Sequence, residues 1–194
     1  MQSDRDARQV VSMAERSDEV LARRVRLGDR RAFVELFDRY GASLYRHALR
    51  MLDGDHHAAE DAVQEALTKA WLKIDTFRGD AKLGTWLFRL VINECLTVRR
   101  RRRPLVVDNH LLEMLATEQQ ADPHGSAVDR HLREALDLAL SELPFRQRAA
   151  WLLREIEDFS YADIADALGT NITVVRGQLH RARTSLAIRM AQWR

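Results

Sequence analysis

The sequence contains one cysteine, three prolines and only 7% aromatic residues among its 194 residues. The single Cys95 excludes an internal disulfide and a cysteine-rich zinc site, and it suits a small packed side chain in a reducing compartment. No run of 18 apolar residues occurs, and the N-terminus lacks the apolar stretch of a secretory signal. We therefore expect a cytoplasmic protein without a membrane span.

Patterns that would indicate catalysis are also missing. The histidines are not at metal-ligand spacings, apart from the weak adjacent pair His56 and His57. There is no glycine-rich phosphate-binding loop, and no nucleophile stands in a recognisable arrangement with a base. The sequence therefore predicts no metal, no cofactor and no enzymatic activity.

Charge is unevenly distributed along the chain, although the formal net charge is only +2 and the isoelectric point is near 9.0. Residues 104–126 contain four acids and no lysine or arginine, and no acid follows Asp166. The position of charge matters more than its sum for nucleic-acid binding. A run of five arginines precedes the acidic segment: Arg99, Arg100, Arg101, Arg102 and Arg103.

The stretch from 160 to 190 predicts a short helix, a tight turn and a second helix. Ser160 suits an N-cap, with Asp163 as the acid of a capping box, and Gly169 suits the helix end. Either Asn171 or Thr173 can cap the second helix. The apolar positions of this second helix predict its buried side: Val174, Val175, Leu179, Ala182, Leu186 and Met190.

The opposite side of this second helix is basic. The side chains on this side are available to solvent or to a ligand: Arg176, Gln178, His180, Arg181, Arg183 and Arg189. A helix-turn-helix with such a face is typical of DNA-binding proteins that place the second helix in the major groove. A solvated basic helix at the end of an ordinary bundle is the alternative, which the turn makes less favourable.

Helical periodicity covers most of the remaining chain, and no segment alternates for long enough to predict a strand. We expect a first helix capped by Ser17 or Asp18, whose apolar stripe is Val20, Leu21, Val25 and Leu27. Two more helices are expected to begin at the caps Asp29 and Asp55, and a fourth to cover 83–102. The helix after Asp29 runs to about Leu52, and its apolar face includes Phe33, Leu36, Phe37 and Tyr40. The predicted fold is all-α: a tail (1–16), a four-helix domain (17–103), an acidic linker (104–126) and a helix-turn-helix domain (127–194).

The helix over 55–76 has the clearest period. Its apolar side includes Val63, Leu67 and Trp71, and its polar side carries Asp61, Gln64 and Glu65. Two carboxylates and an amide on one face suit a basic protein surface. A solvated face is the alternative.

Six short motifs occur in a fixed order: DAVQE (61–65), TWLFRLVIN (85–93), LPFRQR (143–148), LRE (153–155), SYADIA (160–165) and LHRAR (179–183). In this order and spacing the chain resembles the extracytoplasmic-function (ECF) class of bacterial RNA polymerase sigma factors, of the sigma-70 superfamily. The resemblance covers about 18–191. It implies a sigma factor with a second and a fourth sigma domain, which directs promoter recognition, promoter melting and transcription initiation.

The resemblance also implies partners: core RNA polymerase through its clamp helices and flap, promoter DNA and an anti-sigma factor that can hold the chain at the membrane. Asp61, Gln64 and Glu65 would bind the polymerase. A helix-turn-helix regulator acting on duplex DNA without polymerase is the second hypothesis, but it leaves this face without a role.

The resemblance assigns the minus-ten promoter element, read as single-stranded DNA, to the loop after residue 76 and to the helix over 83–102. The residues concerned are Arg78, Asp80, Lys82, Trp86, Arg89 and Asn93. Trp86 also fits a core position. The arginines 99–103 are expected to contact phosphates, which implies a strong dependence of DNA affinity on salt.

The minus-thirty-five element is assigned to the helix-turn-helix and the helix before it. The residues concerned are Arg154, Tyr161, Arg176, Gly177, Gln178, His180, Arg181 and Arg183. Gly177 and Gln178 depart from the serine and basic residue usual in the family, so we expect an unusual promoter preference. The acidic linker is expected either to imitate nucleic acid in a basic channel of the polymerase or to act as a spacer.

Overall fold

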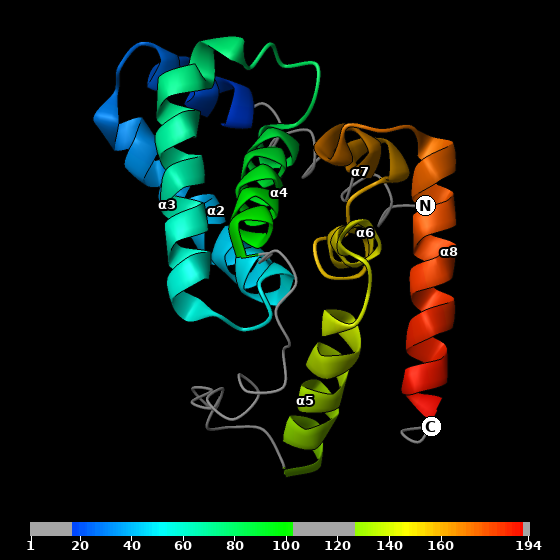
Figure 1. The fold of residues 1–194 in the computed structure, drawn as a ribbon. Helices are drawn as coiled ribbons and strands as arrows, with labels where there is room; N and C mark the ends of the chain where they lie inside the picture. The colour runs from blue at the N-terminus through cyan, green and yellow to red at the C-terminus, as the bar shows by residue number, and fades with distance from the viewer. Residues whose placement is uncertain (1–16, 103–126, 192–194) are drawn as a thin grey trace, which may run out of the picture.

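The computed structural model describes residues 17–102 and 127–191, and within these ranges the chain is helical and contains no strand. The predicted tail (1–16) and the whole of the predicted linker (104–126) lie outside the described residues. The helices form two groups that lie side by side, here called the N-terminal bundle (17–102) and the C-terminal bundle (127–191) (Figure 1).

The N-terminal bundle begins with a helix over 17–26, here called the N-terminal helix. It continues with α2 (Arg30–Met51), α3 (His56–Lys73), the 3₁₀ turn η1 (Ile74–Thr76) and α4 (Leu83–Arg102). The C-terminal bundle consists of α5 (Ala127–Ser141), α6 (Phe145–Glu155), α7 (Tyr161–Leu168) and α8 (Ile172–Arg189). The all-α prediction is therefore confirmed for the described residues.

Most of the predicted caps are present in the helix-turn-helix. Ser160 and Asp163 form the capping box of α7, and Gly169 ends that helix in the left-handed conformation at φ 59°. The Asn171 side chain accepts a hydrogen bond of 3.0 Å from the Val174 amide, so Asn171 rather than Thr173 caps α8.

Some predicted positions were wrong. Ser17 and Asp18 lie inside the N-terminal helix rather than capping it, and the Asp18 carboxylate instead accepts hydrogen bonds from Arg39 and Tyr40 of α2. Val20, Leu27 and Val174 were assigned to buried stripes but are 58%, 79% and 38% exposed. Each is offset around its helix from the positions that pack inward, because one residue advances about 100°.

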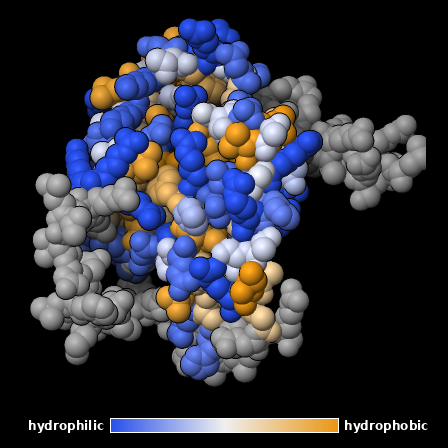
Figure 2. Space-filling model, turned by 45° about the vertical axis from the view of Figure 1, so that its right-hand side comes forward, coloured by the Kyte–Doolittle hydropathy of each residue, from blue (hydrophilic) through white to orange (hydrophobic). Residues whose placement is uncertain are grey.

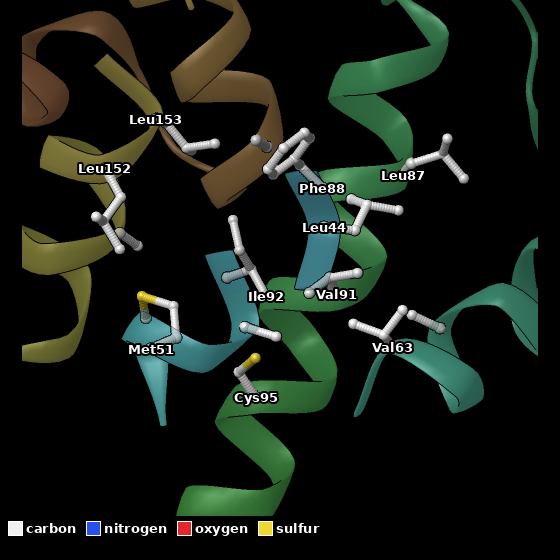
Figure 3. Packing of buried hydrophobic residues seen from close by; sticks show 14 of the residues in the cluster. Leu44, Met51, Val63, Leu87, Phe88, Val91, Ile92, Cys95, Leu152 and Leu153 are labelled. Atoms are coloured by element: carbon white, nitrogen blue, oxygen red, sulfur yellow. The ribbon is translucent and has the colours of Figure 1, made fainter. Parts of the chain in front are cut away.

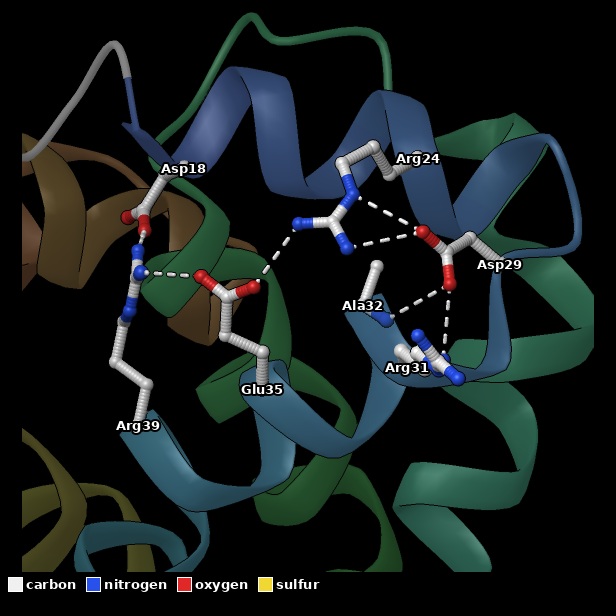
Figure 4. Close-up of polar contacts among 7 residues, drawn as sticks. All are labelled: Asp18, Arg24, Asp29, Arg31, Ala32, Glu35 and Arg39. Atoms are coloured by element: carbon white, nitrogen blue, oxygen red, sulfur yellow. Dashed lines mark hydrogen bonds and ion pairs between the residues drawn. The ribbon is translucent and has the colours of Figure 1, made fainter.

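Ion pairs join the N-terminal helix to α2 (Figure 4). Arg24 bonds to the Asp29 cap at 3.0 Å and to Glu35 at 3.0 Å, and Arg39 links Glu35 to Asp18. The Asp29 carboxylate also accepts from the Arg31 and Ala32 amides, and these amides together with Arg24 lower its pKa. This network orients the two helices, although exposed ion pairs of this kind contribute little to stability.

One hydrophobic cluster extends through both bundles. Figure 3 shows Phe88 and Ile92 of α4 facing Leu152 and Leu153 of α6, with Met51 of α2 on the same side as the two leucines. Phe88 and Ile92 are only 2% and 4% exposed. The two bundles therefore share a packed interface.

The outer surface mixes hydrophobic and hydrophilic side chains on the face drawn in Figure 2. None of the helices in 17–102 and 127–191 is long and apolar enough to cross a membrane.

His47 of α2 is buried beside this interface. It is 2% exposed, packs edge-to-face on Phe88 at 5.2 Å, and neither ring nitrogen has a hydrogen-bond partner among the described atoms. Burial, together with a smaller contribution from charge repulsion by Arg50, lowers its pKa from the usual 6.5 to about 3. His47 is therefore neutral in the folded protein across the physiological range.

We expect acid to destabilise the protein through His47. Between pH 6.5 and 3 the unfolded chain binds a proton at this position that the folded chain does not, so the stability is complete above pH 6.5 and is lost as pH falls. The loss at pH 5 is about 2 kcal/mol. Denaturant unfolding of wild type and His47→Leu at pH 7 and pH 5 measures it. An equal loss in both proteins would contradict the assignment.

Candidate functional site

The polar face of α3 is exposed as the sequence predicted. Asp61, Gln64 and Glu65 all lie on the surface. Glu65 pairs with Lys69 at 3.2 Å, and Lys69 also pairs with Glu94 of α4 at 2.9 Å. Because Lys69 is shared between two carboxylates, the face keeps an acidic character.

An apolar groove of about 880 Å³ lies between α2 and α3 next to this face, and Gln64 lines it. Its floor and walls include Phe33, Phe37, Leu67 and Trp71, with the Phe33 and Trp71 rings edge-to-face at 5.2 Å. Asp38 and Glu60 stand at its edge. We call this feature the α2–α3 groove.

This groove was not predicted from the sequence, because the same aromatic residues have the spacing of core faces. Phe37 is 49% exposed, and its ring lies against Gly41, where an added Cβ would come within 3.1 Å of the ring. A glycine four residues after an aromatic residue is the signal that was available, since it leaves room for the ring along the helix.

The loop after η1 is anchored by contacts of Phe77, while its polar side chains remain at the surface. Arg26 donates to the Phe77 carbonyl at 2.6 Å, and Phe77 packs against Trp86 at 5.6 Å. Trp86 is therefore half-buried, as expected for a packing residue. The loop side chains that the resemblance assigned to DNA are exposed: Arg78, Asp80 and Lys82.

Arg89 and Asn93 of α4 are exposed one helical turn apart, so they share a face. Further along the same helix, Arg99, Arg100 and Arg101 are exposed, and the Arg99 guanidinium lies 5.8 Å from the centre of the Phe145 ring in the other bundle. The Arg102 side chain and all of Arg103 lie outside the described residues.

The predicted DNA-facing side of α8 carries both exposed residues and residues held by other described side chains. Arg176 and His180 are exposed near its N-terminal half. The Arg181 guanidinium folds back over Gly177, where an added Cβ would lie 3.3 Å from it. Gly177 therefore leaves the space that the Arg181 guanidinium occupies.

Two further predicted DNA contacts are engaged within the C-terminal bundle. Arg154 donates to Asp158 at 3.1 Å and to the Phe159 carbonyl at 2.8 Å, and it lies over the Tyr161 ring at 5.8 Å. Arg183 donates twice to Glu155, at 2.7 and 3.1 Å. A phosphate would have to compete with these acids for both arginines.

The structure brings a few of the predicted DNA contacts from each bundle to one place. A cleft of about 460 Å³ is lined by Asn93 and Arg100 of α4 and by Gln178 and Arg181 of α8. The acidic face of α3 and the loop after η1 do not line this cleft. Within the described residues, no group of three His, Cys, Asp or Glu side chains could hold a metal ion.

Each bundle matches a known protein family. The Sigma-70 region 2 family matches residues 36–104, and the Sigma-70 region 4 family matches residues 133–186. Among solved structures, CnrH in complex with the cytosolic domain of CnrY matches 90% of this chain and 97% of its own with a TM-score of 0.69 at 26% identity. The sigma factor RpoE in complex with the anti-sigma factor NepR, from Bartonella quintana, matches 82% of this chain and 96% of its own with the same TM-score at 29% identity.

Several characterised relatives match at the level of sequence. The ECF RNA polymerase sigma factor SigG of Mycobacterium tuberculosis is 38% identical over 83% of this chain, which spans only about half (48%) of that relative's length. The ECF RNA polymerase sigma-E factor of Escherichia coli is 32% identical over 88% of this chain and 92% of its own length. The chain therefore belongs to the ECF class of RNA polymerase sigma factors.

Proposed function

We propose that this chain is a promoter-specificity subunit that binds core RNA polymerase in the cytoplasm, recognises and melts a promoter and starts transcription. It performs no chemistry of its own. The observation that carries the proposal is the α2–α3 groove beside the exposed Asp61, Gln64 and Glu65. An apolar groove with an acidic edge suits a large protein partner with a basic, partly apolar surface.

The two bundles would read two promoter elements. Arg89 and Asn93 on α4 present a guanidinium and an amide to unpaired bases of the minus-ten element, where stacking and edge hydrogen bonds offset the cost of unpairing. Arg176 on α8 is exposed and suited to a base edge in the major groove of the minus-thirty-five element. Arg99, Arg100 and Arg101 would add contacts to phosphates.

An anti-sigma factor is the proposed inhibitor. RpoE, which this chain resembles over most of its length, is described in complex with the anti-sigma factor NepR. An inhibitor that occupied the α2–α3 groove would compete directly with polymerase.

The test is a pull-down with core RNA polymerase. The double variant Asp61→Arg with Glu65→Arg reverses two charges at the edge of the proposed interface, and we expect it to weaken core binding at least about tenfold, because like charges then face each other. The matched control, Glu19→Arg with Asp75→Arg, makes the same change in net charge at two other exposed acids of the N-terminal bundle. Equal core binding by both double variants would refute the role of this face.

A helix-turn-helix regulator that acts alone is the second candidate function. It predicts sequence-specific binding to duplex DNA without polymerase and no effect of the α3 charge reversal. Binding of the same proteins to a library of duplex promoter fragments, measured with and without core enzyme, separates the two.

A further inference from the structure

The cleft next to α4 and α8 has the size of a small-molecule site. Its volume is about 460 Å³, and pockets that hold small ligands in proteins measure about 300–1,000 Å³. One wall comes from α4, and the others come from the first turn of α6, the end of α7 and the first half of α8. We call this feature the α4–α8 cleft.

Three arginines line the α4–α8 cleft: Arg100 of α4, Arg146 of α6 and Arg181 of α8. All three are exposed, and within 17–102 and 127–191 none of them forms an ion pair with a carboxylate. None of the described residues that line the cleft is acidic. A cleft lined by charges of one sign concentrates ions of the opposite sign, so these arginines favour an anionic ligand.

The α6 side of the cleft is suited to a phosphate group. Arg146 Nη1 donates to the Leu168 carbonyl at 3.4 Å, a long hydrogen bond that uses one of the five N–H donors of the guanidinium. Arginine binds phosphate oxygens in pairs through its other donors. The first turn of α6 follows Pro144 and has no side-chain cap, and the amides at such an end carry a partial positive charge.

The remaining lining is suited to a nucleobase. The Phe145 ring is half-buried, and the Arg99 guanidinium lies 5.8 Å from its centre, so a flat group can lie against this ring. Bases stack on aromatic side chains, and side-chain amides can bond to base edges. The amides available in the cleft are those of Asn93, Gln147 and Gln178. Apolar side chains lie between these polar groups: Ile92, Leu96 and Leu168.

We propose that the α4–α8 cleft binds a free nucleoside triphosphate, with the phosphates on the three arginines and the base against Phe145. This ligand class combines several negative charges with one flat, hydrogen-bonding ring, as the lining requires. A nucleotide within a DNA single strand has the same chemistry. The free nucleotide is favoured because Arg146 and Gln147 of α6 belong to neither set of predicted DNA contacts, yet both line the cleft.

A bound nucleotide would share side chains with promoter DNA. Asn93, Arg100, Gln178 and Arg181 line the cleft and are also predicted DNA contacts. Nucleotide and promoter DNA would therefore compete for the same groups, which would make promoter binding sensitive to the nucleotide concentration.

Calorimetric titration of the full chain tests the proposal. The ligands are ATP, GTP, adenosine, guanosine, inorganic triphosphate and a short oligothymidylate. We expect ATP or GTP to bind at least about tenfold more tightly than its nucleoside and than inorganic triphosphate, because only the nucleotide uses the arginines and the ring together. The affinity should fall as the salt concentration rises.

Arg146→Glu is expected to weaken nucleotide binding at least about tenfold, because it replaces a phosphate donor by a negative charge. The matched control is Arg31→Glu, which makes the same change in net charge at an exposed arginine of α2 outside the cleft. Phe145→Leu keeps an apolar side chain but removes the ring, so it should weaken binding of the nucleotide and leave inorganic triphosphate unaffected. Circular dichroism verifies that each variant keeps its helices.

Three results would overturn the proposal. The first is inorganic triphosphate binding as tightly as both nucleotides, since the cleft would then hold any polyanion. The second is equal nucleotide affinity in wild type, Arg146→Glu and Phe145→Leu. The third is tighter binding of oligothymidylate than of either nucleotide, lost in Arg146→Glu, which would assign the cleft to single-stranded DNA. Core polymerase is absent from these titrations, so their outcome is independent of the proposed function as a sigma factor.

Discussion

Replacing Phe37 by aspartate is expected to weaken the binding of core RNA polymerase about a hundredfold. Phe37 is 49% exposed at the edge of the α2–α3 groove, and its ring completes the apolar lining together with Phe33 and Trp71. Large aromatic side chains in such grooves carry a disproportionate share of binding energy. A carboxylate there would also have to be dehydrated in the complex without a partner.

The measurement is a titration of labelled protein with core polymerase. Val34→Asp is the matched control, because Val34 is an apolar residue of the same helix, 57% exposed, and does not line the groove. Gly41→Ala provides an intermediate case: its added Cβ would meet the Phe37 ring at 3.1 Å and displace it, which should cause a smaller loss. If Phe37→Asp and Val34→Asp bind polymerase equally well, the groove is not part of the interface.

Replacing Phe88 by alanine is expected to lower the free energy of unfolding by about 3–5 kcal/mol. The ring is 2% exposed and stands between His47 and Phe159, with ring centroids 5.2 Å away on each side. Its removal leaves a cavity where α2, α4 and the C-terminal bundle meet, and rigid helices on three sides prevent the space from closing. A typical domain is stable by only about 5–15 kcal/mol, so this loss is a large part of the total.

Chemical denaturation followed by circular dichroism measures this loss. Val34→Ala, at an exposed position, should change stability by no more than about 0.5 kcal/mol. A loss below about 1 kcal/mol in Phe88→Ala would show that the interface between the bundles is not packed in solution. The interface contribution is separated by Phe159→Ala, which removes one neighbour of Phe88 and leaves His47 in place.

Local signals in the sequence predicted the helix-turn-helix well. Ser160 and Asp163, Gly169 and Asn171 each determine a helix end through hydrogen bonds or φ preferences within a few residues, so no tertiary information was needed. The exposed face of α3 was predicted for the same reason, because helical periodicity separates Asp61, Gln64 and Glu65 from the apolar side.

The predictions of burial and capping failed for side chains whose surroundings depend on neighbouring helices. Phe37 and Val174 have the spacing of buried residues, yet both are exposed, since each helix buries only as wide a stripe as its neighbours cover. Asp18 was expected to cap a helix, but Arg39 and Tyr40 of α2 take its carboxylate. Such outcomes depend on residues about 20 positions away and on how the helices cross.

The all-α architecture, the helix-turn-helix and the family could be predicted from the sequence alone, because caps and periodicity act locally and the short motifs occur in a fixed order. Tertiary packing was needed to bring Asn93 and Arg100 of α4 into one cleft with Gln178 and Arg181 of α8, to form an apolar groove next to the acidic face of α3, and to bury Arg148 at the end of α2. Arg148 contacts Arg50 across 98 positions of sequence, and no local pattern encodes a contact over that separation. Apart from the Asp53 carboxylate, its partners are backbone carbonyls, which every residue carries, so they become specific only when folding brings the end of α2 against α6.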